Sequence, residues 1–231
     1  MKVAIISDLH GNIDALDAVV SNFEKYDISK VFVLGDIVGY YYYPEKILSL
    51  LEKYDCLYIR GNHERILQNL IAGKVSSEEV VKKYGHGHDI AIEKLSNSQI
   101  EFLINLPDEL AFNLDGKNFL LKHANPWNLD DYLYSDSNET DLKRALSGNY
   151  DYVFVGHSHY SFDFLFDSKT LINPGSVGQN RKKGGCASWV LFDTSEFNYR
   201  FIDTNYSINN LLLMIDKVDP QNDYLKRVLL R

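Results

Sequence analysis

Cysteine is scarce in this sequence, since only Cys56 and Cys186 occur among 231 residues. The two lie far apart in the chain, which favours reduced thiols over a disulfide or a thiolate metal site. No apolar stretch approaches the roughly 20 residues that cross a bilayer. The N-terminus also lacks the charged head and cleavage site of a signal peptide. We therefore expect a cytoplasmic protein with no membrane partner.

Basic residues are also in the minority. Lysine and arginine number 24 against 32 aspartates and glutamates, which gives a net charge of −8, and they form no long patch. This balance argues against binding of long nucleic acid through charge alone. The sequence also has no internal repeat, no low-complexity tract and no Gly/Ser linker. We therefore expect residues 1–231 to form a single domain.

The N-terminal third of the chain alternates predicted strands and helices. Strands are predicted over Val3–Ile6, Val31–Leu34 and Cys56–Arg60, with helices after Asn12 and from Pro44. This βαβαβ order predicts a largely parallel sheet in this region.

The remainder of the chain has a mixed character. Helices are predicted over Ser76–Leu95 and Ser96–Leu106, and Asp115-Gly116 is typical of a β-hairpin turn. Further hairpins follow, and two more helices are predicted over Ile208–Lys217 and Asp223–Leu230. The element order predicts an α/β fold in which two mixed β-sheets pack as a sandwich with flanking helices.

Five short polar segments each follow a predicted buried strand. They are Asp8-Leu9-His10, Gly35-Asp36, Gly61-Asn62-His63-Glu64, Lys122-His123 and Gly156-His157-Ser158-His159. The carboxyl ends of strands in open α/β sheets converge on one crevice, so we expect these side chains to meet there. The segments hold five of the seven histidines. Together they form the ligand set of a two-metal hydrolytic site.

Each of these residues alone has an ordinary structural explanation. Aspartate and asparagine at strand ends usually cap turns, and a single Asp-x-His triplet is common. Five strand ends that all carry ligand-type residues are not explained in this way. The combination therefore favours a metal site over separate structural roles.

The combined motifs resemble those of the calcineurin-like metallophosphoesterases across most of the chain. Asn173-Pro174-Gly175-Ser176 is also similar to a turn of the small bacterial and archaeal branch that includes the YfcE-like phosphodiesterases. The resemblance implies an α-β-β-α sandwich with two metal ions. It implies that the first ion is held by Asp8, His10, Asp36 and His159. It further implies that Asp36 bridges to a second ion, which is completed by Asn62, His123 and His157.

Nitrogen and oxygen ligands without a thiolate suit Mn²⁺, Fe, Zn²⁺ or Ni²⁺, of which we favour Mn²⁺. The resemblance implies phosphate-ester hydrolysis by a hydroxide that bridges the two ions, with His63 as general acid and Glu64 orienting it. A phosphodiesterase acting on small phosphodiesters or nucleotides is the favoured activity. A phosphomonoesterase acting on nucleotides or proteins is the alternative, followed by a non-catalytic protein-binding scaffold.

Several weaker signals leave alternatives open. Arg181 could pair with a substrate phosphate or lie on a solvated loop. The tyrosines at 40–43 could stack on a nucleobase, although packing of this loop against the next helix is favoured. His86 and His88 fall two apart within a predicted helix, where their side chains diverge, so neither is expected to be a ligand. The segment at 130–134 could form a subunit contact, which leaves a homo-oligomer open.

Overall fold

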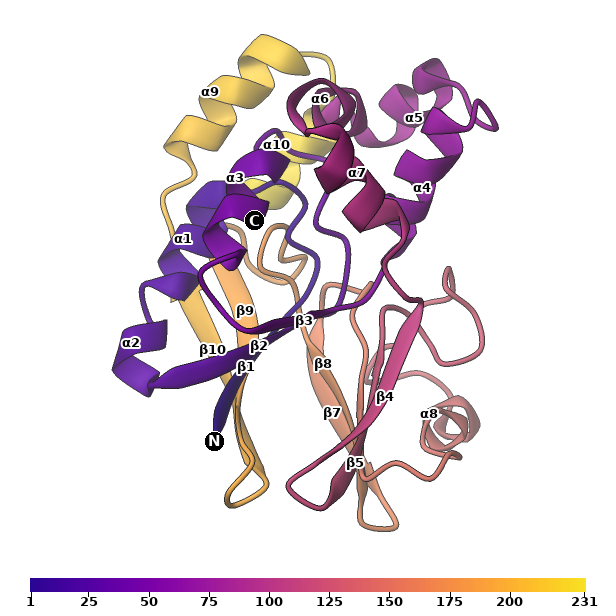
Figure 1. The fold of residues 1–231 in the computed structure, drawn as a ribbon. Coiled ribbons are helices and arrows are strands. Elements are labelled where there is room, and N and C mark those ends of the chain that lie inside the picture. The colour runs from indigo at the N-terminus through magenta and orange to yellow at the C-terminus, as the bar shows by residue number, and fades with distance from the viewer.

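The computed structural model describes residues 1–231 and contains two five-stranded sheets (Figure 1). The first sheet comprises β1 (Lys2–Ile6), β2 (Ile28–Val33), β3 (Cys56–Tyr58), β9 (Cys186–Asp193) and β10 (Asn198–Asn205). The second comprises β4 (Glu109–Leu114), β5 (Lys117–Lys122), β6 (Tyr152–Phe154), β7 (Ser161–Phe166) and β8 (Lys169–Pro174). The predicted strands before all five polar segments are therefore present.

The helices come from several parts of the chain. They are α1 (Ile13–Val20), α2 (Phe23–Tyr26), α3 (Pro44–Leu51), α4 (Asn62–Ile71), α5 (Ser77–Tyr84), α6 (Gly87–Lys94), α7 (Asn97–Ile104), α8 (Glu139–Ala145), α9 (Asn209–Val218) and α10 (Asp223–Leu229). No helix among them has both the length and the apolar character required to cross a membrane.

Both sheets are mixed. The first has the order β10-β9-β1-β2-β3, in which β1, β2 and β3 run parallel and β9 pairs antiparallel with β1. The second has the order β4-β5-β6-β8-β7, with a parallel centre of β5, β6 and β8. Figure 1 shows the orange strands β9 and β10 beside the indigo β1, so strands from distant parts of the sequence share one sheet.

Strand β1 shows how the sequence specifies a layered core. Val3 and Ile5 belong to the apolar cluster between the sheets, whereas Ala4 and Ile6 belong to the cluster under the helices. Successive residues of a strand point to opposite faces, so an uninterrupted apolar run fits a strand that is covered on both sides. All four of these residues are fully buried.

Helices cover the outer face of each sheet. Residues of α1, α3, α6 and α7 pack in the cluster on the outer side of the first sheet, and α8 packs against the second. The layers are therefore helix, sheet, sheet and helix, as Figure 1 shows. The expected sandwich of two mixed sheets with flanking helices is confirmed.

The single helix predicted over Ser76–Leu95 is wrong, because the chain breaks between α5 and α6. Gly85 has a φ of +78°, a left-handed conformation that glycine adopts without steric cost. At Gly87, an added Cβ would lie 2.6 Å from the backbone nitrogen of Tyr40, so α6 begins in close contact with the loop after β2. The break directs the buried His88 toward the polar ends of the strands.

Two of the tyrosines that follow Gly39 are core residues. Tyr41 and Tyr42 are fully buried and pack with α9 and α10. The Tyr42 hydroxyl donates to the Asp219 carboxylate at 2.8 Å. Packing was the favoured interpretation and is confirmed for these two rings, but their partners are the C-terminal helices rather than the next helix in sequence.

Candidate active site

The predicted polar segments meet at the carboxyl ends of β1, β2, β5 and β6, beside the first turn of α4. The structure brings together Asp8, His10, Asp36, Asn62, His63, His123, His157 and His159, each at most 7% exposed. Buried polar and charged side chains are costly unless they are paired or coordinate a metal. The expected convergence on one crevice is therefore observed.

One cluster consists of Asp8, His10 and His159. The Asp8 Oδ1 atom lies 3.2 Å from His159 Nε2 and 3.8 Å from His10 Nε2. The two Nε2 atoms are themselves 3.2 Å apart. Three ligand-type atoms thus face a common centre.

A neighbouring cluster consists of Asp36, His123 and His157. The Asp36 Oδ2 atom lies 3.2 Å from His123 Nε2 and 3.7 Å from His10 Nε2 of the first cluster. The Asn62 Oδ1 atom adds a neutral oxygen 3.0 Å from His123 Nε2. Asp36 therefore presents one oxygen between the two clusters.

The two carboxylates are held in the same way. The backbone N–H of His63 donates to Asp36 Oδ1 at 2.8 Å, and that of His157 donates to Asp8 Oδ2 at 3.0 Å. The other oxygen of each carboxylate faces imidazole nitrogens, and Asp8 Oδ1 has no hydrogen-bond partner although it is buried. Each carboxylate is thus oriented by one oxygen and leaves the other available to a cation.

Three imidazoles are oriented by backbone carbonyls at Nδ1, and His157 faces the Asp130 carbonyl oxygen with Nε2 at 3.2 Å. His10 Nδ1 lies 3.2 Å from the Val38 oxygen, and His123 Nδ1 lies 2.7 Å from the Leu34 oxygen. A carbonyl oxygen only accepts, so Nδ1 carries the proton and donates it. In the neutral ring, Nε2 then presents its lone pair to the centre, as metal-ligating histidines do.

The third of these imidazoles is His159, whose Nδ1 donates to the Gln179 oxygen at 2.7 Å. Carboxylate oxygens and imidazole nitrogens therefore converge from several sides. This donor set of nitrogen and oxygen atoms fits a divalent transition-metal ion. The buried aspartate and histidine clusters are consistent with divalent metal binding.

Burial and charge set the protonation of the site. Burial lowers the pKa of His10 to about 3 and that of His157 to about 4. For His123, burial lowers the pKa, but the Asp36 carboxylate outweighs it and raises the pKa to about 10. Burial raises the pKa of Asp8, and the imidazoles of His159 and His123 together outweigh it, so the net pKa is lowered. A metal-free site therefore keeps a proton on His123, which cation binding would release.

The backbone is left-handed at the positions that supply most of these side chains. The φ angles are +55° at Asp8, +48° at His10, +53° at Asp36, +65° at His157 and +63° at His159. This conformation costs about 1 kcal/mol or more for a residue with a Cβ, although aspartate and histidine tolerate it best. Such strain concentrates at functional sites, where the surrounding structure maintains it.

His63 differs from the other histidines of the site. Its ligating atom lies within 4.8 Å of those of His10 and Asp36, yet its buried Nδ1 has no hydrogen-bond partner. Its ring stacks on that of His88 with centroids 5.0 Å apart, and burial lowers its pKa well below the ordinary value. The carbonyl that fixes Nδ1 in His10, His123 and His159 is missing here. His63 is therefore less constrained as a ligand than those three.

Glu64 has a different role from the one expected, because it makes no hydrogen bond to His63. Its Oε2 accepts from the backbone nitrogens of Gly61 and Asp36, both at 2.8 Å. Its Oε1 accepts from Ile37 at 2.7 Å and from Val38 at 3.1 Å. All the hydrogen bonds of this carboxylate go to backbone N–H groups. Glu64 thus ties the loop after β2 to the start of α4.

The site opens into a pocket of about 260 Å³. Its lining includes Tyr40, His63, Lys83, Tyr84, Tyr132 and Arg181. Arg181 thus lies at the pocket. From the sequence, a contact with substrate phosphate and a position on a solvated loop were equal alternatives. Lys83, Tyr84 and Tyr132 were not predicted, because their segments contain no recognisable motif. His88 is a buried histidine that belongs to neither metal-ligand cluster, as its spacing from His86 led us to expect.

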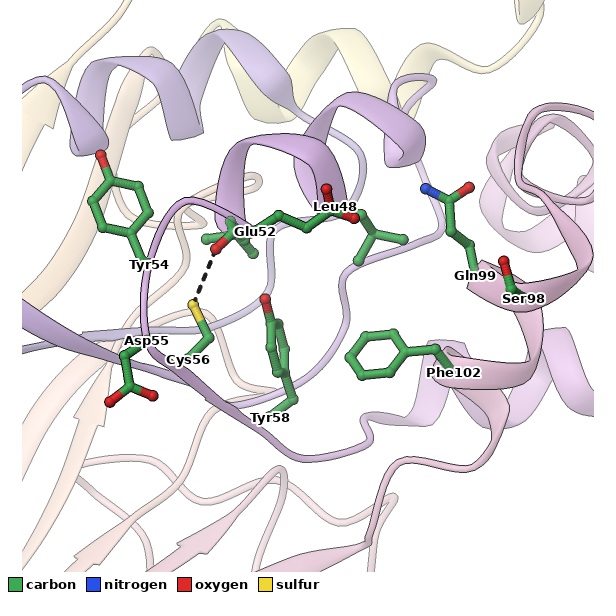
Figure 2. Close-up of a pocket in the computed structure, with 10 residues that line it drawn as sticks. Leu48, Glu52, Tyr54, Asp55, Cys56, Tyr58, Ser98, Gln99 and Phe102 are labelled. Atoms are coloured by element: carbon green, nitrogen blue, oxygen red, sulfur yellow. Dashed lines mark hydrogen bonds between the residues drawn. The ribbon is translucent and has the colours of Figure 1, made fainter.

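Another hollow, of about 530 Å³, lies beside the edge strand β3 between α3 and α7 (Figure 2). Figure 2 shows the rings of Tyr54, Tyr58 and Phe102 around it, with the carboxylates of Glu52 and Asp55. Its lining contains no lysine, arginine or histidine. An anionic ester is therefore better accommodated by the smaller pocket at the histidine clusters.

The sandwich and the buried Asp/His clusters at its strand ends define a metallophosphoesterase. The chain belongs to the calcineurin-like phosphoesterase superfamily, whose domain model matches residues 1–196. It is 35% identical to an uncharacterized protein of Methanocaldococcus jannaschii over 224 residues, which cover 89% of this chain and 88% of that protein.

Solved structures share the fold. A metallophosphoesterase from Sphaerobacter thermophilus has a TM-score of 0.79 at 23% identity, with coverage of 99% of this chain and 98% of the other. The YfcE phosphoesterase from E. coli has a TM-score of 0.52 at 16% identity, with coverage of 90% and 100%. The resemblance to this family that the motifs indicated is confirmed.

Proposed function

We propose that the protein is a binuclear metal-dependent phosphoesterase that hydrolyses small phosphodiesters or nucleotides. Asp8, His10, Asp36 and His159 would hold one ion, and Asp36 would bridge to a second. Asn62, His123 and His157 would complete that second ion. The observation that carries the proposal is the position of Asp36 Oδ2, which lies between two clusters of buried aspartate and histidine ligand atoms.

When bound, two divalent ions would lower the pKa of a water ligand and neutralise the charge of the phosphoryl oxygens. Among the candidate metals we favour Mn²⁺. The chain itself contributes orientation, because backbone groups fix one oxygen of each carboxylate and one nitrogen of each of three imidazoles. This preorganisation reduces the rearrangement that catalysis would otherwise require.

His63 is the proposed general acid. It lines the pocket, lies beside the clusters, and lacks the carbonyl partner that would dedicate it to a metal. A phosphate bound next to it would favour its protonated form by charge. It would then donate a proton to the departing alkoxide, which is worth roughly 10²–10⁴-fold for a poor leaving group.

A phosphomonoesterase is the second candidate, and a specific observation favours it. Lys83 and Arg181 line the pocket, and neither forms an ion pair with a carboxylate. Additional positive charge suits a dianionic monoester better than a monoanionic diester. A non-catalytic scaffold is disfavoured because every proposed ligand and His63 are in place.

The test is a matrix of metals and substrates. Metal-free protein would be supplied with Mn²⁺, Ni²⁺, Zn²⁺ or Mg²⁺ and assayed on p-nitrophenyl phosphate and bis(p-nitrophenyl) phosphate, while calorimetry counts bound ions. We expect two ions per chain, hydrolysis that requires them, and a preference for the diester. Preference for the monoester would establish the second candidate. Binding of one ion or none would contradict the binuclear proposal, and Asp36→Ala should weaken both ions.

A further inference from the structure

Arg181 is placed at the pocket without a partner for its charge. Its Nε is buried and makes no hydrogen bond, and no carboxylate lies within ion-pair distance. The guanidinium lies 5.8 Å from the ring centroid of Tyr132, which in turn stacks on His157 at 4.2 Å. The guanidinium is thus next to the proposed metal centre, with donors available to a ligand.

Lys83 contributes a second cation to the same pocket. It is exposed, in the last turn of α5, and its Nζ lies 4.9 Å from the ring centroid of Tyr84. No carboxylate pairs with it, whereas the carboxylate of Asp130 in this pocket is paired with Arg65. The lining therefore holds two cations that the protein itself does not neutralise.

These two charges are notable because the chain carries a net charge of −8. The metal ions would bind the scissile phosphate itself, and the single charge of a diester would leave Arg181 and Lys83 in this lining without a counterpart. Arginine suits phosphate or carboxylate because its planar fork donates two parallel hydrogen bonds, and lysine adds a point charge. The pocket volume of about 260 Å³ limits the ligand to a small molecule.

We propose that Arg181 and Lys83 bind a second anionic group, a phosphate or a carboxylate, on the substrate. The preferred substrates would then be small phosphate esters that carry another anionic group close to the scissile phosphate. The inference rests on the proposed function for the position of the scissile phosphate. It adds the chemical class of the rest of the substrate.

The test uses two p-nitrophenyl phosphodiesters that differ only in the second arm, which is ethyl in one and 2-phosphoethyl in the other. We expect the wild type to show a kcat/KM about tenfold higher for the anionic arm. Arg181→Gln and Lys83→Gln should each lower kcat/KM for the anionic arm about tenfold, mainly through KM, since a charged hydrogen bond is worth at least about that factor. Both should lower kcat/KM for the ethyl ester by much less than for the anionic arm.

Matched controls are provided by the adjacent lysines. Lys82→Gln and Lys182→Gln make the same change in charge, but these side chains line other hollows. Neither control should alter the ratio between the two substrates. A ratio near one in the wild type, or equal losses in pocket and control variants, would overturn the inference.

Ligand binding provides a readout that does not depend on turnover. Calorimetry with metal-loaded protein should show tighter binding of inorganic pyrophosphate than of phosphate, and Arg181→Gln should abolish that difference. Retention of the difference in both pocket variants would refute the anion site. Absence of hydrolysis with all metals would count against the proposed function, while the pyrophosphate result would still decide this inference.

Discussion

Replacement of Glu64 by glutamine distinguishes the observed role of this residue from the role that the sequence indicated. The amide keeps the oxygen that accepts from Ile37 and Val38, but it places an NH₂ group opposite the N–H groups of Gly61 and Asp36. Two buried donors then lose their acceptor, at about 1–3 kcal/mol each. Part of this loss of stability is offset, because glutamine removes a buried negative charge. Burial and the Asp36 carboxylate already disfavour that charge and raise the pKa of Glu64 to about 7.

We therefore expect Glu64→Gln to lower the free energy of unfolding of the metal-free protein by about 3 kcal/mol. In a chain of 231 residues this corresponds to a fall in Tm of about 6–12 °C. Urea denaturation and calorimetry would measure both quantities. The exposed Glu101→Gln is the control and should change stability by less than about 0.5 kcal/mol.

The kinetic consequence separates the two roles. If Glu64 holds the loop of Asp36, its replacement should reduce hydrolysis of alkyl and nitrophenyl esters by the same factor and weaken metal binding. If it oriented His63 instead, alkyl esters would suffer selectively. Wild-type stability in Glu64→Gln, or a selective loss on alkyl esters, would refute the structural argument.

Three further outcomes follow from the site. His63→Ala should reduce hydrolysis of alkyl phosphodiesters at least about 100-fold more than that of nitrophenyl esters, because only a departing alkoxide needs a proton from the general acid. Equal losses on both substrates in steady-state assays would show that His63 is not the general acid. His88→Ala should lower kcat on alkyl esters about tenfold without changing metal content, because it removes the ring that stacks on His63. His88→Phe keeps the stacked ring but not the hydrogen bond from His88 Nε2 to the His63 oxygen, so recovery of kcat would assign the positioning to the ring and no recovery would assign it to the hydrogen bond. Gly178→Ala should lower the free energy of unfolding by about 3 kcal/mol in urea titrations, because the added Cβ would lie 1.9 Å from the Leu9 carbonyl oxygen. The control is Gly73→Ala, whose added Cβ meets no atom and which should cost only about 1 kcal/mol.

The layered fold was accessible from the sequence because central strands such as β1 are apolar on both faces. Runs such as Val31–Leu34 are buried between the other sheet and the helices, so neither face needs polar residues. Helix α4 was not predicted, because its first residues face the site and its apolar pattern is short. The break at Gly85 was missed because glycine is tolerated inside helices and the flanking periodicity continues.

The convergence of the site residues was predictable because parallel strands end at the same edge of a sheet. Their hydrogen bonds were not, since the carbonyls that fix His10, His123 and His159 come from loops distant in sequence. Glu64 was misassigned for the same reason. Its sequence neighbour His63 suggested a hydrogen bond between the two side chains, whereas most of its actual partners come from a distant loop. Backbone N–H groups from the β2 loop compete for a carboxylate more effectively than an adjacent imidazole whose side chain points elsewhere.

The position of β1 between β2 and β9 has a consequence for biosynthesis. During translation, β2 is available soon after β1, but β9 leaves the ribosome only after the whole second sheet has been made. Until then one edge of β1 exposes unpaired backbone groups, which invite association with other chains. Products truncated before β9 should therefore be prone to aggregation, and chaperones that shield strand edges should associate with the nascent polypeptide.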